Sequence, residues 1–273
     1  MNAITADPPA VAGTTVGQPR LLGLRNLVRK DLAEWLHGKR PWIVLAVTTS
    51  VFALTAANAR ITEWAARSFP ADPGDGPAKV LSVLPLDNIL VAIGTQFIVL
   101  AAIFATMSLL IAERDSGTLA WTISKPVSRT SVLVSKWLTS TLILWVTAVI
   151  IPLALTTVLV TVLYGLPDLT AVMALGASLI TVPALFVGIA LAAATIVPSQ
   201  AAVAAIGVTL LAVPPIVGGI LPSLTPFFPT SIFDWSVQAS TGGPASLVTP
   251  VAWLAGLAAL FVLARRRLNA MDL

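Results

Sequence analysis

The sequence predicts an all-α integral membrane protein with six transmembrane helices. Of its 273 residues, 57% are hydrophobic and only 10% are charged, and the mean hydropathy is +0.93. A soluble domain carries charge on about 25% of its residues, so much of this surface must face lipid. Six long stretches of the chain also lack Asp, Glu, Lys, Arg and His. Each is long enough to cross a bilayer, which takes about 20 apolar residues.

The first 40 residues precede these stretches. Residues 1–19 are rich in Ala, Pro, Gly and Thr and contain no apolar run, so we expect a disordered cytoplasmic tail. Residues 20–40 show helical periodicity and predict an amphipathic helix lying in the headgroup layer. A helix packed on a soluble partner is the alternative. The expected apolar face contains Leu21, Leu24, Val28, Leu32 and Trp35, opposite Asn26, Lys30, Glu34 and His37. The expected membrane-interface residues of this helix are Arg25, Arg29, Lys30 and Trp35.

The transmembrane domain is predicted over residues 41–267. Its six spans are expected at about 41–59, 89–112, 137–166, 169–197, 201–221 and 247–264. Proline inside a helix removes a backbone donor, so kinks are expected near Pro152 and Pro183. The fifth span is expected to be broken by Pro214, Pro215, Gly218 and Gly219.

The basic residues predict the orientation, because cytoplasmic loops are enriched in Lys and Arg. Placing the N-terminus inside puts thirteen of the sixteen basic residues in the cytoplasm and leaves only Arg60, Arg67 and Lys79 outside. Six acids fall on each side, giving a net charge of +7 inside and −3 outside. We therefore expect both termini in the cytoplasm. The cytoplasmic Lys and Arg residues explain the high isoelectric point, which therefore does not indicate a nucleic-acid partner.

Two outer segments are long. Residues 60–87 are predicted to form a loop with a short helix at its start. Residues 222–249 are rich in Pro and Phe. They predict short re-entrant helices, because irregular backbone at membrane depth must be packed on protein or line a wet cavity.

Several kinds of chemistry are excluded by composition. The chain has no Cys and a single His, His37, so neither a thiolate site nor a His-rich metal cluster is expected. It also lacks the G-x-x-x-x-G-K-[ST] loop that cradles ATP phosphates, so it is not expected to hydrolyse ATP by that route. Either energy comes from a partner chain or the protein is not an active transporter.

The cytoplasmic segment between the second and third spans reads ERDSGTLAWTISKPVSRTSVLVSK from Glu113 to Lys136. Ser116 is expected to cap a short helix with apolar positions at Leu119, Trp121 and Ile123, which Pro126 would end. Such a helix suits docking to a soluble partner. An ordinary interfacial loop anchored by Trp121 remains the alternative from physics alone.

This segment resembles the corresponding loop of ABC-2 type transporter permeases. Their pattern is an acid, Gly-Thr-Leu, Pro-Val-Ser-Arg and then Lys. Two positions depart from it: Ala120 stands where an acid is common, and Ser135 where Gly is common. The matching positions are Glu113, Gly117, Thr118, Leu119, Pro126, Val127, Ser128, Arg129 and Lys136.

The resemblance implies a permease subunit without catalytic activity. The basic N-terminal helix would be the family's elbow helix, and the short loop helix its coupling helix, seated on a separate ATPase subunit. Two ATPase copies would bind ATP and Mg²⁺, so no cofactor or metal is expected in this chain. A second permease chain, as a homodimer or a related heterodimer, would complete the complex. The expected coupling residues are Glu113, Gly117, Thr118, Leu119, Trp121, Pro126, Val127, Ser128 and Arg129.

Other functions stay open. The resemblance implies a multi-pass protein of a bacterial-type plasma membrane, and spans without charge suggest export of a lipid or hydrophobic drug. An ABC subunit that transmits force without moving cargo is an alternative. An ion-coupled carrier is another, with the Pro214–Gly219 break as its binding site. A membrane-embedded enzyme is disfavoured, because no paired acid and base lie near a predicted interface.

Overall fold

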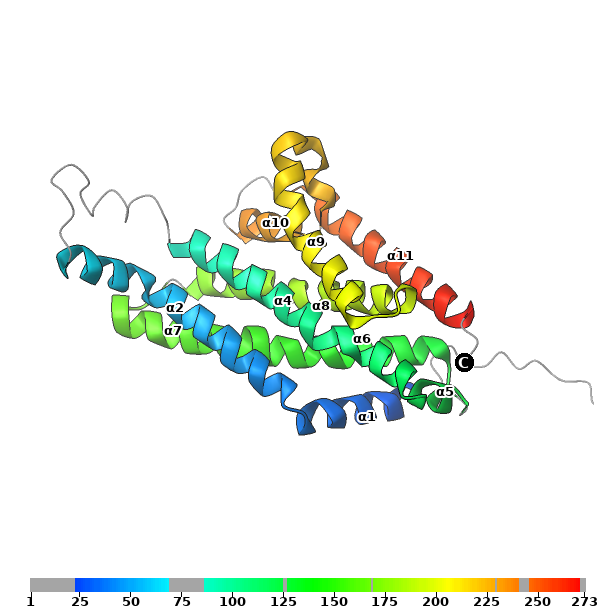
Figure 1. Ribbon diagram of the computed structural model, residues 1–273. Coiled ribbons are helices and arrows are strands. Elements are labelled where there is room, and N and C mark those ends of the chain that lie inside the picture. Colours follow the sequence, from blue (N-terminus) through cyan, green and yellow to red (C-terminus); the bar gives the residue numbers. More distant parts are fainter. Residues whose placement is uncertain are drawn as a thin grey trace, which may run out of the picture.

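The computed structural model describes residues 23–68, 86–124, 127–167, 169–228, 230–240 and 246–270, which form helices and no strand (Figure 1). The predicted all-α class is therefore confirmed. The predicted tail 1–19, and residues 69–85 of the first outer segment, lie outside the described residues. The helices in chain order are α1 (Leu24–His37), α2 (Arg40–Ser68), α4 (Leu86–Asp115), α5 (Thr118–Ile123), α6 (Arg129–Leu144), η1 (Trp145–Ile150), α7 (Ile151–Tyr164), α8 (Leu169–Ile196), α9 (Gln200–Ile220), η2 (Pro222–Phe227), α10 (Ser231–Ser240) and α11 (Val248–Ala270).

Six helical segments are long and apolar enough to cross a membrane, as predicted. The third is one continuous run in which α6, η1 and α7 follow each other without a turn. The six segments are Arg40–Asn58, Gln96–Asp115, Arg129–Tyr164, Leu175–Ile196, Gln200–Ile220 and Val248–Ala270.

Helix α8 forms the centre of the bundle. In the most apolar stretch of its span, 78% of the residues are buried, against 18% in the corresponding stretch of α9 and 11% in that of α11. It packs against α4, α6, α10 and α11, with Leu179 and Phe186 fully buried. Small residues allow close approach between helices. A Cβ atom on Gly207 of α9 would lie 2.6 Å from Ile103 of α4.

The third span contains a π-helical turn just before Pro152. Pro152 has no amide hydrogen to donate to the carbonyl four residues earlier, and its ring crowds that carbonyl. The chain responds by widening one turn, so that the Ile151 amide bonds the carbonyl of Val146, five residues back. The Thr147 carbonyl, which would normally accept from Ile151, instead accepts from the Thr48 hydroxyl of α2 at 3.1 Å.

The predicted break in the fifth span is wrong. Helix α9 continues through Pro214, Pro215, Gly218 and Gly219 to Ile220. Both prolines lie in the last two turns of the helix, and each removes one amide donor. The backbone hydrogen bonds of the earlier turns are therefore kept. Unwound backbone facing lipid would leave more polar groups unpaired than two prolines do.

The two ends of the bundle differ. Helices α1 and α5 and the C-terminal end of α11 gather at one end (Figure 1). At the other, α2 is tied to α7: Arg60 donates to the Leu163 carbonyl at 2.8 Å, and the Tyr164 hydroxyl donates to the Ala56 carbonyl at 3.0 Å. The short helix expected at the start of segment 60–87 is a continuation of α2. Two short helices, η2 and α10, lie in the segment predicted to be re-entrant.

Candidate functional site

The segment from Glu113 to Lys136 begins with a tight turn after α4. Gly117 has φ of 72°, the left-handed conformation that favours glycine, and its amide donates to the Arg114 carbonyl at 3.1 Å. A Cβ atom at Gly117 would meet nothing within 4 Å. Backbone conformation, not space, therefore requires glycine here.

Two hydroxyls complete this turn. The last carbonyls of a helix have no partner within it, and that of Glu113 accepts from Ser116 at 3.3 Å and from Thr118 at 3.2 Å. Ser116 therefore caps the C-terminal end of α4, whereas it was expected to cap the N-terminus of the helix that follows. The Thr118 carbonyl in turn accepts from the Thr122 hydroxyl at 2.8 Å, within α5.

Helix α5 is fixed on one side and exposed on the other. Leu119 has no exposed surface and packs in a cluster with Leu27, Leu110 and Leu268. Trp121 is 65% exposed. Both were expected to contact a partner, but Leu119 is enclosed by its own chain. Only Trp121 of the two is accessible.

The end of the segment starts the third span. The Ser128 side chain caps α6 by accepting from the Ser131 amide at 3.0 Å. Val127 packs against the residue that precedes α1, because a Cβ atom on Gly23 would lie 2.9 Å from Val127 Cγ2. Pro126 lies outside the described residues.

Four charged side chains join α1, α4 and α6 in a network, and three of them, Asp31, Glu113 and Lys136, are buried. Lys136 Nζ lies 2.9 Å from Glu113 Oε2 and 3.7 Å from Asp31 Oδ1, and its side chain is 5% exposed. Lys30 donates to Glu113 Oε1 at 2.7 Å. The Ser135 hydroxyl donates to Asp31 Oδ2 at 2.8 Å. The two ends of the motif, Glu113 and Lys136, are thus directly paired.

Ser135 departs from the family pattern, in which Gly is common, and this departure has a structural use: glycine could not donate the hydrogen bond to Asp31.

Lys30 is the most exposed residue of the charged network, with 46% of its side chain accessible. Burial alone would lower the pKa of Lys30. The hydrogen bond with Glu113 and the nearby carboxylates of Glu113, Asp31 and Glu34 raise it overall. Lys30 therefore stays charged through the neutral range.

A metal ion is not favoured at this cluster. Carboxylate oxygens of Asp31, Glu34 and Glu113 lie within 4.8 Å of one another, which is close enough to share a cation. The ammonium groups of Lys30 and Lys136 already pair with Glu113. They supply the positive charge that a metal would bring.

The buried face of α1 differs from the predicted one. Leu27, Asp31 and Trp35 are buried, and α1 packs along α6. Trp35, expected among lipid headgroups, is 4% exposed and belongs to the protein core. Leu32, expected on the apolar face, is 37% exposed. The buried face of α1 includes the charged residue Asp31, so the periodicity of apolar residues predicted a neighbouring face instead. Arg25 and Arg29 are exposed, as expected for a polar surface.

Two arginines extend the contacts of the segment to the remaining spans. Arg114 donates to the Pro198 carbonyl at 2.8 Å, in the connection between α8 and α9. Arg129 donates to the Leu268 carbonyl near the end of α11. The segment from Glu113 to Lys136 is therefore bonded to α1, to the α8–α9 connection and to α11.

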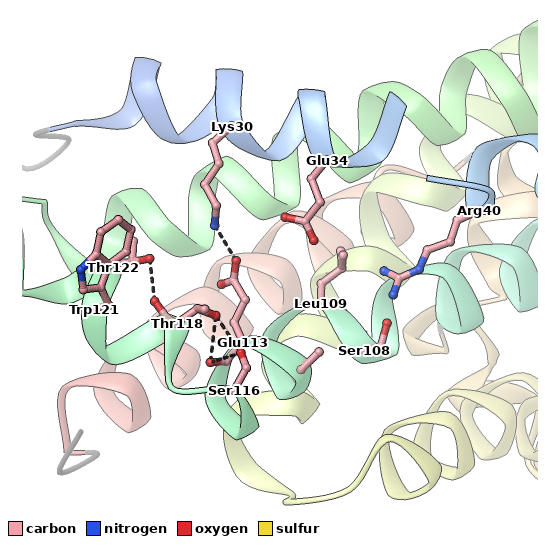
Figure 2. Close-up of a pocket in the computed structure, with 11 residues that line it drawn as sticks. Lys30, Glu34, Arg40, Ser108, Leu109, Glu113, Ser116, Thr118, Trp121 and Thr122 are labelled. Atoms are coloured by element: carbon pink, nitrogen blue, oxygen red, sulfur yellow. Dashed lines mark hydrogen bonds and ion pairs between the residues drawn. The ribbon is translucent and has the colours of Figure 1, made fainter. Parts of the chain in front are cut away.

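A pocket of about 300 Å³ lies between α1, the start of α2, α4 and α5. Figure 2 shows Lys30 pointing at Glu113, with Glu34 and Arg40 farther along the pocket and Trp121 at its other end. The remaining lining residues are Ser108, Leu109, Ala112, Ser116, Thr118 and Thr122.

The motif from Glu113 to Lys136 therefore predicted this segment but not the network of charged side chains around it. Glu113, Gly117, Thr118, Val127, Ser128 and Arg129 each have a defined contact or conformation here. Asp31 was not predicted as a site residue. Its spacing of four residues from both Leu27 and Trp35 places it on the same helix face as these apolar residues, and this spacing was the available signal.

Comparison with protein families agrees with the motif. The model of a family described as ABC-2 family transporter protein matches residues 25–273. A comparison with curated proteins found no match. The family match covers both the segment and all six candidate spans. The chain therefore belongs to the ABC-2 transporter family and is a multi-pass membrane permease of the ABC transporter class.

Proposed function

We propose that this permease couples ATP hydrolysis on a separate ATPase subunit to export of an apolar or amphipathic substrate. Helix α5 is the contact point. The observation that carries this proposal is the two-sided character of α5: Leu119 is fully buried while Trp121 is 65% exposed. An exposed tryptophan on a short, well-anchored helix is the kind of residue that dominates a protein interface.

The bonds around α5 suit transmission of movement. A push on α5 reaches the second and third spans through the Glu113–Lys136 pair. It reaches the other spans through Arg114 and Arg129. In this proposal the contacting end is cytoplasmic, where positive charge is expected to gather, and two ATPase copies bind ATP and Mg²⁺.

We further propose that two permease chains assemble side by side. Helices α9 and α11 are the least buried spans and expose faces that lipid or another copy must cover. A carrier that binds ions at a broken fifth helix is less well supported, because α9 is continuous.

The test is Trp121→Asp in the full chain, expressed together with its ATPase subunit. We expect the variant to insert normally and to recover less than one tenth of the ATPase in mild detergent. A lost tryptophan hot spot costs at least about 2 kcal/mol, and 1.4 kcal/mol corresponds to tenfold. Recovery of the ATPase at the parent level, with unchanged transport, would contradict the proposal.

The matched control is Trp64→Asp. Trp64 is 63% exposed and lies beyond the apolar part of α2. The C-terminal end of α2 lies far from α5 (Figure 1). This variant should leave ATPase recovery unchanged. Leu119→Asp is unsuitable, because a charge placed in the buried cluster would disrupt the fold itself.

A further inference from the structure

We propose that the pocket between α1, α2, α4 and α5 binds the headgroup of a phospholipid that carries both a phosphate and a primary amine. The site does not depend on whether this lipid is cargo or a bound component of the membrane. It follows from the charges lining the pocket and from the apolar surface that adjoins it.

The pocket lies at headgroup depth. Arg40 lines it and is also the first residue of the first candidate span. Trp42, two residues further, is 67% exposed, as suits an aromatic side chain at the membrane interface. A lipid lying against α2 would therefore bring its headgroup, not its chains, to Arg40.

One side of the pocket offers donors for a phosphate. Within the described part of the chain, the side chain of Arg40 forms no hydrogen bond or ion pair, so its planar fork of N–H groups can bind two phosphate oxygens. Lys30 has further ammonium hydrogens beyond the one donated to Glu113. The Ser108 side chain lines the pocket as well.

The other side attracts a cation. The Glu34 carboxylate likewise has no hydrogen bond or ion pair among the described residues. It lies within 4.8 Å of the carboxylates of Asp31 and Glu113. Lys30 and Lys136 both pair with Glu113, and Lys136 also lies near Asp31, so Glu34 is the one carboxylate of the three that forms no ion pair with a described residue. The amine of a lipid headgroup would balance the charge of Glu34 by bonding its carboxylate.

Apolar surface continues from the pocket into the span. Ile43, Val47 and Leu54 of α2 are 59%, 48% and 64% exposed. Their spacing places them on the side of the helix that carries Arg40. On α4, Phe104 lies one turn above Ser108 and is 51% exposed. Acyl chains of a lipid held at Arg40 would cover these side chains.

A lipid fits this arrangement better than a side chain of the ATPase. A soluble partner could reach Trp121 at the mouth of the pocket, but it could not cover Val47 and Leu54 within the span. A single acidic or basic side chain would also leave either Glu34 or Arg40 unmatched.

The test uses the full chain purified in detergent and titrated with three lipids of identical chains: phosphatidylethanolamine, phosphatidylglycerol and phosphatidylcholine. Bound lipid is counted by native mass spectrometry. We expect the ethanolamine lipid to bind most tightly, because only it has both a phosphate and an amine that donates hydrogen bonds. Arg40→Ala should weaken all three lipids about tenfold. Glu34→Gln should weaken the ethanolamine lipid most, because it loses both the charge attraction and the hydrogen bond, and should not weaken the glycerol lipid, which has no cationic group.

Arg29→Ala is the control, since Arg29 is exposed on α1 but does not line the pocket. It should leave the preference for the ethanolamine lipid over the choline lipid unchanged. Equal losses in Arg29→Ala and Arg40→Ala would show unspecific attraction to a basic surface and overturn the proposal. Equal binding of the ethanolamine and choline lipids to the parent would overturn it too. So would displacement of the lipid by an equal concentration of soluble phosphoethanolamine, because the chains would then contribute nothing.

Discussion

At the scale of single residues, the main feature is a lysine buried among carboxylates at the start of the third span. Lys136 is 4% exposed, Asp31 5% and Glu113 8%. Ions are costly to remove from water, so such groups persist only when paired and hydrogen-bonded. Each has at least one polar partner here. The network thus ties three helices together while leaving no buried charge uncompensated.

Removing the central cation should be severely destabilising. Lys136→Met leaves two buried carboxylates with only Lys30 nearby, and breaking a buried pair in this way costs about 3–5 kcal/mol. Unfolding of the detergent-solubilised chain should therefore begin at a clearly lower temperature. Adding Glu113→Gln to this variant should restore part of the loss, because one unpaired charge is then removed.

Lys30→Met is the matched comparison for this prediction. Lys30 also bonds Glu113, but its side chain is 46% exposed, and exposed pairs contribute about 0–1 kcal/mol. If the two methionine variants unfolded at the same temperature, the burial of Lys136 would not be the cause of the loss.

At the scale of one element, the third span shows how a proline reshapes a membrane helix. The π-turn before Pro152 transfers the Ile151 amide from the Thr147 carbonyl to that of Val146. The Thr48 hydroxyl shares its hydrogen between the Val44 carbonyl at 2.7 Å and the Thr147 carbonyl at 3.1 Å. A local backbone defect is thus compensated by a neighbouring helix, as the absence of water in a bilayer requires.

A double-mutant cycle tests this compensation. Thr48→Val should cost about 0.5–1.5 kcal/mol, because it removes the only cross-helix donor to Thr147 among the described residues. In a Pro152→Ala background the cost should shrink, since an ordinary α-turn can return the Ile151 amide to Thr147. Chemical unfolding of the parent, the two single variants and the double variant gives the coupling energy between positions 48 and 152.

Thr55→Val is the control for the cycle. Among the described residues its hydroxyl bonds only the Val51 carbonyl of its own helix, at 2.7 Å. Its cost should be the same with proline or alanine at position 152. Strict additivity of Thr48→Val and Pro152→Ala would contradict the explanation.

At the scale of the whole molecule, the segment from Glu113 to Lys136 links helix ends that are far apart in sequence. Arg129 reaches the end of α11, 139 residues later, and Arg114 reaches the connection after α8. Arg129 donates to a carbonyl in the last turn of α11, where carbonyls have no partner within the helix, whereas Arg114 donates to a carbonyl of the connection itself.

These two bonds should stabilise different ends independently. Arg129→Ala should raise amide exchange roughly tenfold in the last turn of α11, since a charge-assisted hydrogen bond contributes about 1.5 kcal/mol. Arg114→Ala should do so around residues 197–202 and leave α11 unchanged. Hydrogen exchange read by mass spectrometry distinguishes them. Identical exchange patterns in the two variants would mean that the fold loosens as one unit.

Some of the fold and the site could be predicted because they depend on local composition and spacing. Apolar runs without charge predicted all six spans, and Gly-Thr-Leu followed by Pro-Val-Ser-Arg predicted the segment at the candidate site. The face of α1 was mispredicted because Asp31 lies inside, paired with Lys136, which is 105 residues away in the sequence. The break at Pro214 was mispredicted because a local propensity was weighed without the bilayer's demand for paired backbone.

The sequence alone therefore determined that this chain spans a membrane six times and carries a family-type segment between its second and third spans. Burial of apolar runs in lipid needs no information about neighbours. Only the tertiary structure decided which charges are buried together, which face of α5 is open and where a lipid headgroup would fit. These properties arise from side chains of distant segments meeting at a few ångströms, and no single stretch of sequence specifies its partner.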